Sequence, residues 1–405
     1  MINSGDTAWI ITATALVLLM TLPALALFYG GLVQAKNILS VLAHCFAVAC
    51  LGSVLWFLCG YSLAFSGNGA WLGDTANLLL ANVTRGSVRA GTALPESVYV
   101  MFQMTFAIIT PALIIGAYVE RIKFSAVLLI SGLWLLIVYV PVCHWVWGGG
   151  WLAARGTMDY AGGIVVHVTA GISALVIAAM LGARHEFPHG IRPPHAPWMV
   201  MVGASLLWVG WFGFNAGSAL SAGGDAGMAL LATHLSAATA TLVWMGIEWI
   251  KFGKPSLVGA VTGTIAGLAA ITPASGFVGP EAAVLLGALS GIVCFGAVLL
   301  VKRVMQVDDA LDVLGVHGVG GALGSLMLPF LTLLGGGVAL SRGVGDQFAV
   351  QALAVGVVAL WSVVATVIIT KIAAWTVGLR VDREDETVGL DFAAHGETGY
   401  HHSAR

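Results

Sequence analysis

Long apolar runs, separated by short polar or glycine-rich stretches, recur from one end of the chain to the other. A run of about 18 or more apolar residues is long enough to cross a bilayer as a helix. A β-barrel would instead show short segments of alternating polarity. The pattern therefore predicts an all-α polytopic membrane protein. We expect eleven transmembrane helices, at residues 8–32, 38–65, 97–118, 124–146, 162–183, 197–217, 227–250, 256–273, 281–301, 313–334 and 347–372.

Basic residues are distributed unevenly over the loops that join these helices. With the N-terminus outside, one face holds thirteen of the 17 Lys and Arg residues, and the other holds only Arg85, Arg89, Arg155 and Arg342. Because basic loops stay on the cytoplasmic side of a membrane, the expected topology is N-out and C-in. The expected location is the cytoplasmic (inner) membrane of a bacterial cell.

Composition supports the membrane assignment. Hydrophobic residues make up 59% of the chain and charged residues only 9%, whereas a soluble domain carries about 25% charged residues. No basic patch indicates nucleic-acid binding. The five cysteines are odd in number and scattered through apolar segments, which favours buried free thiols over a disulfide framework. The first ten residues lack the basic start of a signal peptide, so the first apolar run is expected to remain as a helix.

The end of the chain differs from the rest. Residues 1–376 are expected to form the transmembrane domain, and residues 377–405 a polar cytoplasmic tail. Leu390, Phe392 and Tyr400 stand among charged residues and glycines in this tail. The tail could therefore fray into solvent or dock on the protein or on a partner, and the sequence leaves both open. Its last five residues, "HHSAR", carry no interpretable pattern.

Two polar segments of similar pattern interrupt the apolar sequence. In "DYAGGIVVHVTAG", Asp159 stands eight residues before His167, and in "DVLGVHGVGGALG", Asp312 stands five residues before His317. Each histidine is followed four residues later by a glycine. The two histidines are 150 residues and five predicted helices apart, so the units that carry them must enter the membrane in opposite directions. This predicts two inverted five-helix repeats plus a final helix, with a site near the midplane between the repeats.

Ionisable residues inside a membrane are costly and often functional. Each histidine alone could simply complete a hydrogen bond in the core, but two at equivalent positions favour a functional pair. Small neighbours let the two helices approach closely, so the imidazoles of His167 and His317 could touch. Two adjacent imidazoles cannot both be protonated cheaply. A closed metal site usually needs four ligands, and no cysteine or carboxylate has suitable spacing, so we expect no metal and no cofactor.

Asp159 and several aromatic residues could act around this pair. Asp159 precedes a predicted helix, so its carboxylate is expected to cap the N–H groups of the first turn. Phe102 and Phe106 lie four residues apart and share one helix face. Considered by composition alone, such aromatic residues are more often packing residues or membrane-interface anchors than parts of a site.

Seven ordered segments together resemble the ammonium transporter (Amt) family, in its bacterial branch. They are "ALFYGGLVQAKN", "QMTFAIITPALIIGAYVERIKFSAVL", "VWGGG", "DYAGGIVVH", "WFGFNAGSAL", "DDALDVLGVHGVGG" and the tail pattern "GLD…HGE…Y". The resemblance covers nearly the whole chain. It implies a transporter for nitrogen uptake, not an enzyme, built as a homotrimer of eleven-helix subunits with one pore each.

The resemblance also implies residue roles. The family's ammonium-recruitment site corresponds to Trp147, Phe106, Ser218, Asp159 and Ala161, where Ala161 would offer a backbone carbonyl. The stacked gate beneath it corresponds to Phe106 and Phe214. The twin histidines of the pore correspond to His167 and His317.

By this resemblance, the substrate would be ammonium or methylammonium. Ammonium would lose a proton, and ammonia would pass along the histidines. The proton would either stay outside or be relayed by the histidine pair, and the sequence leaves this choice open. The tail resembles the segment through which family members couple subunits and bind the regulator PII. The alternatives are an ammonium sensor that signals through PII with little flux, and a Rhesus-like ammonia or CO₂ channel. Trp147 and Ser218 favour the transporter branch over the Rhesus-like one.

Overall fold

The computed structural model describes residues 1–400, and the "HHSAR" segment lies outside the described residues. Within residues 1–400 the secondary structure is helical, with only two isolated β-bridges. Ten helical stretches of this part of the chain are long and apolar enough to cross a membrane. They are Ser4–Leu32, Ala35–Phe65, Glu96–Ala117, Phe124–Ala154, Gly163–Leu181, Pro197–Gly217, Gly224–Phe252, Pro280–Val304, Leu314–Leu331 and Val344–Thr376.

An eleventh apolar helix, Leu257–Ile271, is shorter than these ten. All eleven segments expected from the sequence are therefore helical, while the eleventh membrane crossing stays a prediction. The α-helices are α1 (Ser4–Leu19), α2 (Leu25–Leu32), α3 (Ile38–Leu55), α4 (Tyr61–Phe65), α5 (Glu96–Ile114), α6 (Phe124–Trp134), α7 (Val140–Val146), α8 (Trp151–Ala154), α9 (Thr169–Leu181), α10 (Pro197–Gly217), α11 (Gly224–Phe252), α12 (Leu257–Ile271), α13 (Pro280–Leu299), α14 (Val319–Leu331), α15 (Val344–Thr376), α16 (Arg383–Val388) and α17 (Leu390–His395).

Short π-helical turns interrupt several spans. In one of them, Pro23 lacks the N–H that a regular helix needs at that position. Two others, η7 (Gly163–Val168) and η9 (Leu314–Gly318), lead directly into α9 and α14 and contain the two histidines of the repeated pattern. Such π-helical turns occur frequently at functional sites.

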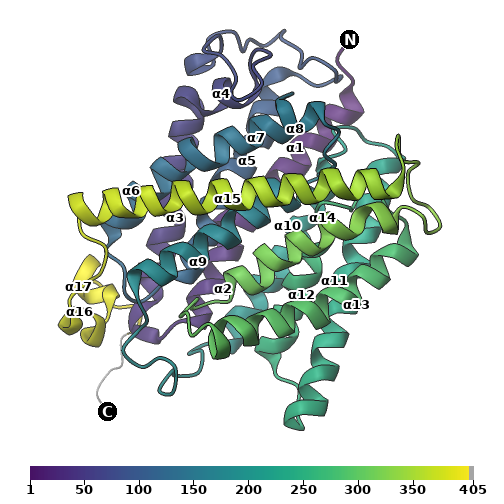
Figure 1. Ribbon diagram of the computed structural model, residues 1–405. Helices are drawn as coiled ribbons and strands as arrows, with labels where there is room; N and C mark the ends of the chain where they lie inside the picture. The colour runs from purple at the N-terminus through teal and green to yellow at the C-terminus, as the bar shows by residue number, and fades with distance from the viewer. Residues whose placement is uncertain (401–405) are drawn as a thin grey trace.

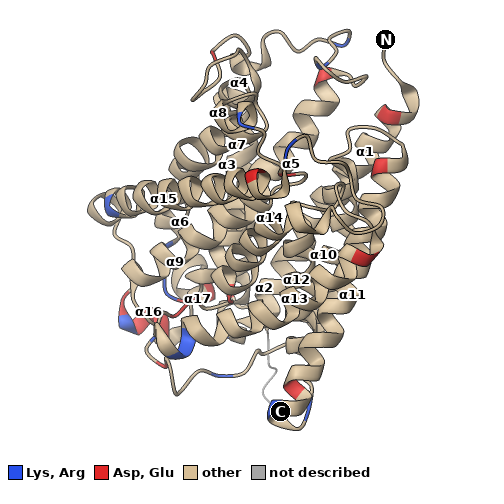
Figure 2. Ribbon diagram, turned by 45° about the vertical axis from the view of Figure 1, so that its right-hand side comes forward, with Lys and Arg blue, Asp and Glu red and all other residues tan. Residues whose placement is uncertain are grey.

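The helices form one tilted bundle, and α15 crosses its face as a single long helix (Figure 1). It packs against α6, α9 and α14. Lys, Arg, Asp and Glu residues lie mainly at helix ends, in the connecting loops and in the tail (Figure 2). The middle of the bundle is consequently almost free of charge, as expected for a structure that is surrounded by lipid.

Glycines allow α9 and α14 to cross at very close range. A Cβ atom added to Gly171 would collide with the backbone of Gly318. A Cβ on Gly321 would likewise contact the carbonyl oxygen of Gly163 and the Cβ of His167. Backbone-to-backbone contact of this kind is typical of membrane helices with small residues at the crossing, and it brings the two π-helical turns together.

The tail docks on the bundle near the end of α15 (Figure 1). The Ser40 N–H donates to Asp391 Oδ1 at 2.8 Å, and the Leu390 N–H donates to Asn37 Oδ1 at 2.8 Å. The ammonium of Lys36 donates to two backbone carbonyls of α16. Of the two possibilities that the sequence left open, the structure therefore shows docking for residues up to 400.

The five cysteines are unpaired, as expected from their number. Cys45, Cys143 and Cys294 are buried, but Cys50 is exposed on the protein surface and Cys59 is half-buried. The expectation of buried thiols was therefore wrong for Cys50. It lies on the outward side of α3, where a membrane protein can carry an apolar side chain against lipid.

Candidate functional site

The carboxylate of Asp159 caps the start of η7, as its place in the sequence predicted. Oδ1 accepts the N–H groups of Gly162 and Gly163 at 2.9 and 2.6 Å, and Oδ2 accepts those of Ile164 and Val165 at 2.9 and 3.0 Å. Burial raises the pKa of Asp159, while these four hydrogen bonds oppose the shift. All four donors favour the ionised carboxylate, so Asp159 places a negative charge at a helix N-terminus, which the helix dipole also stabilises.

Trp147 is fixed by the same residue. Its indole Nε1–H donates to the backbone carbonyl of Asp159 at 2.8 Å. The Trp147 ring meets Phe106 edge to face, with centroids 5.6 Å apart and planes at 85°. Ala161 is fully buried in the turn that joins Asp159 to η7. The recruitment residues expected on this side therefore lie close together, although they come from separate helices.

Two phenylalanine rings pack together next to Trp147. Phe106 and Phe214 have centroids 4.2 Å apart with planes at 34°, and both side chains are buried. Ser218 lies one turn after Phe214, and its hydroxyl donates to the Phe214 carbonyl at 2.9 Å. Phe102 packs against the edge of Phe106 at 5.1 Å. The stacked pair thus lies between Trp147, which contacts Phe106, and His167, which contacts Phe214.

His167 and His317 meet beyond this stacked pair. Their Nδ1 atoms are 3.2 Å apart, and the rings stack with centroids 5.2 Å apart. One Nδ1–H can donate to the lone pair of the other Nδ1, which requires two different tautomers. Within residues 1–400, Nε2 of His167 has no hydrogen-bond partner. The pair therefore presents an unpaired polar atom in the buried interior of the bundle.

Trp211 supports His167 from the side. The two rings stack with centroids 5.5 Å apart, and the indole N–H of Trp211 donates to Thr272 Oγ1 at 2.9 Å. Neither contact was expected from the sequence. Trp211 and Phe214 are three residues apart and share one helix face, which could have indicated that the aromatic lining continues, but no pattern indicated Thr272.

The equivalent of Asp159 in the second segment is Asp309, which corrects the match to Asp312. Asp309 stands eight residues before His317, the same spacing as in the first segment. Its Oδ2 accepts the Leu314 N–H at 2.8 Å, at the start of η9. Asp312 has a left-handed backbone with φ of 63°. Its carboxylate instead forms an ion pair with Lys302 at 2.7 Å.

The two capping carboxylates differ in how fully they are paired. Oδ1 of Asp309 has no hydrogen-bond partner within residues 1–400. Burial, together with the charge of Asp312, raises the pKa of Asp309 to about 6. Four donors thus oppose the effect of burial on the pKa of Asp159, whereas Asp309 is poised to bind a proton near neutral pH.

A cavity of about 500 Å³ opens beside His317 on the tail side of the bundle. Its wall includes His317, Asp312, Lys302, Glu120, Arg184 and Glu386. The histidine pair is thus separated from Trp147 by two phenylalanine rings and borders, on the other side, a chamber lined partly by charged residues. No group of three His, Cys, Asp or Glu residues within residues 1–400 is arranged to hold a metal ion.

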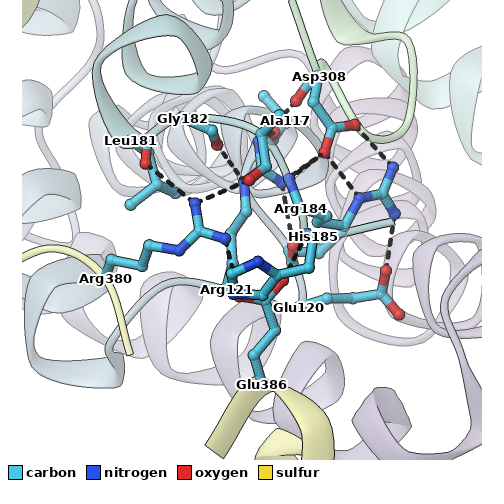
Figure 3. Close-up of polar contacts among 12 residues, drawn as sticks. Ala117, Glu120, Arg121, Leu181, Gly182, Arg184, His185, Asp308, Arg380 and Glu386 are labelled. Carbon is cyan, nitrogen blue, oxygen red and sulfur yellow. Dashed lines mark hydrogen bonds and ion pairs between the residues drawn. The ribbon is translucent and has the colours of Figure 1, made fainter. Parts of the chain in front are cut away.

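A buried charge cluster forms part of this chamber (Figure 3). The guanidinium of Arg184 donates to Asp308 at 2.8 and 2.9 Å and to Glu120 at 2.7 Å. Burial disfavours the charge on Arg184, but the two carboxylates outweigh it and raise its pKa. Burial likewise acts to raise the pKa of Asp308, but its contacts with Arg184 and Arg121 lower it overall. These ion pairs fasten the loop before η9 to the loop after α9.

The tail joins the same cluster. Arg380 donates to Glu386 at 2.8 Å and to the carbonyl of Ala183 at 2.8 Å. Glu386 also accepts the N–H of His185 at 3.1 Å. Figure 3 shows these contacts converging beside Arg184. The tail is therefore connected to the loop that carries Arg184, and through it to Asp308, next to the capping residue Asp309.

Comparison with known proteins identifies the family of this chain. The sequence profile of the Ammonium Transporter Family matches residues 8–400. The ammonium transporter of Bacillus subtilis is 42% identical over 98% of this chain and 99% of its own length. The crystal structure of Mep2 from Saccharomyces cerevisiae is 34% identical with a TM-score of 0.85, over 94% of this chain and 91% of that one.

A structure named "Sensor Amt Protein" is 29% identical with a TM-score of 0.90, over 96% of this chain and 98% of that one. The family and its named members are transporters and related membrane proteins rather than enzymes. With a profile match across almost the entire sequence and a relative of 42% identity along nearly its full length, the chain belongs to the ammonium transporter family.

Proposed function

We propose that this protein transports ammonium across the cytoplasmic membrane. Family membership and the names of its relatives support ammonium as the substrate. The observation that carries the mechanism is a continuous line of side chains from Trp147, through the stacked phenylalanines, to the histidine pair and the chamber. It offers a cation site, a dry barrier and a hydrogen-bonding path in that order.

Recruitment takes place at Trp147, Phe106, Ser218, Asp159 and Ala161. A cation over aromatic rings gains roughly 0.5–2 kcal/mol, more when it is desolvated. The Ser218 hydroxyl donates its hydrogen bond to the Phe214 carbonyl. The lone pairs of its oxygen therefore remain free to accept an ammonium N–H. The ionised carboxylate of Asp159 adds a favourable field, and the Ala161 carbonyl adds a further acceptor.

Phe106 and Phe214 act as a gate that separates ammonium from its proton. Their tightly packed, buried rings exclude water, and an apolar passage disfavours any cation. Ammonium that enters this passage loses its proton more readily than it does in water. Neutral ammonia then passes, whereas potassium has no proton to release.

His167 and His317 guide ammonia beyond the gate. The unpaired Nε2 of His167 can exchange a hydrogen bond with ammonia, which lowers the cost of a polar molecule in an apolar pore. The Nδ1–Nδ1 contact gives the released proton a second route through the same pair. Transport is therefore either neutral or accompanied by one relayed proton.

The assembly proposed is a homotrimer of eleven-helix subunits, N-out and C-in, with α12 as the eighth crossing. The uneven distribution of basic loops supports this orientation, with thirteen of the 17 Lys and Arg residues on the tail side. The α9 and α14 units are the cores of two inverted repeats, and the equal spacing of Asp159–His167 and Asp309–His317 supports this. A PII-type regulator binds at the tail face, where α16 borders the chamber.

Transport is tested by recording currents on solid-supported membranes after an ammonium pulse at several pH values. We expect saturable, ammonium-dependent signals from wild-type protein, and their loss in the His167→Ala, His317→Ala double variant. Protein that folds normally but gives neither current nor ammonia flux would exclude the transport function.

A sensing role is the second candidate, because one structural neighbour is named "Sensor Amt Protein". The same double variant separates the two functions. If ammonium still releases bound PII from this non-conducting variant, the protein acts mainly as a sensor.

A further inference from the structure

The last helix of the bundle carries two buried glutamines near its start. The side chains of Gln347 and Gln351 in α15 are 2% and 0% exposed. A buried amide is retained at low cost only if its donors and acceptor are paired. In the predicted architecture α15 lies outside both repeats, so its polar contacts are not required by the pore symmetry.

Gln351 forms hydrogen bonds with both backbone polar groups of Met158. Its Oε1 accepts the N–H of Met158 at 2.9 Å, and its Nε2 donates to the carbonyl of Met158 at 2.7 Å. The same Nε2 also donates to the carbonyl of Ser325 in α14 at 3.2 Å. A side-chain amide that satisfies both the N–H and the C=O of one residue behaves like a neighbouring strand, so it fixes the position and the orientation of that residue.

Gln347 extends the same contact along the loop. Its Nε2 donates to the carbonyl of Gly156 at 2.9 Å and to Gln351 Oε1 at 3.2 Å. The two glutamines therefore hold residues 156–158 from the side of α15. Gly156 and Gln347 are 191 positions apart in the sequence, and Met158 and Gln351 are 193 apart.

Met158 directly precedes Asp159, on which two features of the outer site depend. The Asp159 carboxylate caps η7 through four N–H groups. The Asp159 carbonyl accepts the indole N–H of Trp147 at 2.8 Å. A displacement of Met158 would consequently move both the negative charge and the aromatic ring against which ammonium is proposed to bind.

We propose that Gln351 is a positioning residue for ammonium recruitment: by clamping Met158 it sets the geometry of Asp159 and Trp147. This inference rests on the recruitment role proposed above for those two residues. Gln351 itself need not touch ammonium. Its contribution is to hold the outer site from a helix that belongs to neither half of the pore.

The first test compares Gln351→Leu with Thr366→Val in proteoliposomes. Thr366 is a matched control because it is buried in the same helix and bonds Ser173 Oγ at 2.9 Å, away from the loop. We expect Gln351→Leu to raise the KM for methylammonium about tenfold, with Vmax per folded transporter within about twofold of wild type. The control should lower thermal stability without moving KM. An unchanged KM in Gln351→Leu overturns the proposal.

Gln351→Glu provides a variant that can be rescued by pH. A protonated glutamic acid can still accept from the Met158 N–H and donate to its carbonyl, whereas the ionised form repels that carbonyl. Burial favours the protonated form. The ratio of the variant's KM to that of wild type should therefore rise with pH. A ratio that is constant across pH contradicts the clamp.

Hydrogen–deuterium exchange tests the same idea without any transport assay. In Gln351→Leu, the amides of Gly162 to Val165 should exchange at least about tenfold faster than in wild type, because their acceptor has lost its support. Equal exchange rates overturn the inference. If wild-type protein failed to transport ammonium at all, only the proposed function would fall, since this measurement reports the positioning of Asp159 directly.

Discussion

Replacing Asp309 by asparagine should stabilise the protein at neutral pH, although it removes a residue that caps a pore helix. The asparagine carbonyl can still accept the Leu314 N–H, and its amide would replace the Oδ1 atom that has no partner within residues 1–400. The variant also removes a carboxylate that the folded protein prefers to keep protonated. The stabilisation should therefore depend on pH.

The magnitude follows from the pKa of Asp309, which burial raises to about 6, against an ordinary value of about 3.9. Because the folded state binds the proton more tightly, its contribution to stability is complete below about pH 3.9 and is lost as the pH rises through about 6. Two pKa units correspond to about 3 kcal/mol. Roughly half of this loss is already present at pH 5. The advantage of Asp309→Asn over wild type should thus be about 1.5 kcal/mol at pH 5 and about 3 kcal/mol at pH 7.5.

Thermal unfolding of purified protein in detergent at these two pH values measures the effect. We expect the melting temperature of Asp309→Asn to exceed that of wild type by several degrees at pH 7.5 and by about half as much at pH 5. Asp308→Asn is the control, since the pKa of Asp308 is lowered and its loss should destabilise the protein at pH 7.5. The same gain at both pH values, or no gain at pH 7.5, would show that Asp309 is not protonated more easily in the folded state.

Three further changes test other parts of the site. Asp159→Asn keeps one acceptor oxygen for the four N–H groups of η7, so we expect a loss of about 3 kcal/mol in unfolding experiments and methylammonium uptake below about a tenth of wild type. Arg184→Gln leaves buried carboxylates without their cation, which should cost about 3–5 kcal/mol at pH 7. Wild type should lose stability as the pH falls through the lowered pKa of Asp308, and the variant should lack this pH dependence. If the variant and wild type lost the same stability in acid, the reasoning would be wrong. Gly171→Ala should separate the crossing helices and lower both stability and uptake, whereas Gly356→Ala, at a position with open space, should change neither.

The sequence predicted the helices well because length and apolarity are local properties. Each expected segment is helical, and α12, with residues 257–271, is the one whose length falls short of the other spans. The contact between His167 and His317 was also foreseeable, since small neighbours at both positions permit a close crossing. In both cases a short-range pattern determines the outcome.

Other features depend on geometry that no short-range pattern encodes. Asp312 was matched to Asp159 by its position near the histidine, but its left-handed backbone directs the carboxylate to Lys302 instead. The stacking of Trp211 on His167 depends on how α10 meets η7 across 44 residues of sequence. The contact of Gln351 with Met158 likewise joins positions 193 residues apart.

The backbone contact between Gly171 and Gly318 also limits how such a protein can change over time. Because Gly171 faces the backbone of Gly318 directly, a larger side chain at position 171 would push against the other half of the molecule. The sequences of the two halves can therefore diverge freely at the ends of the helices, where the aromatic residues and the charge cluster lie. At their crossing they must remain alike, so new specificities have room to evolve at the entrances and little room at the centre.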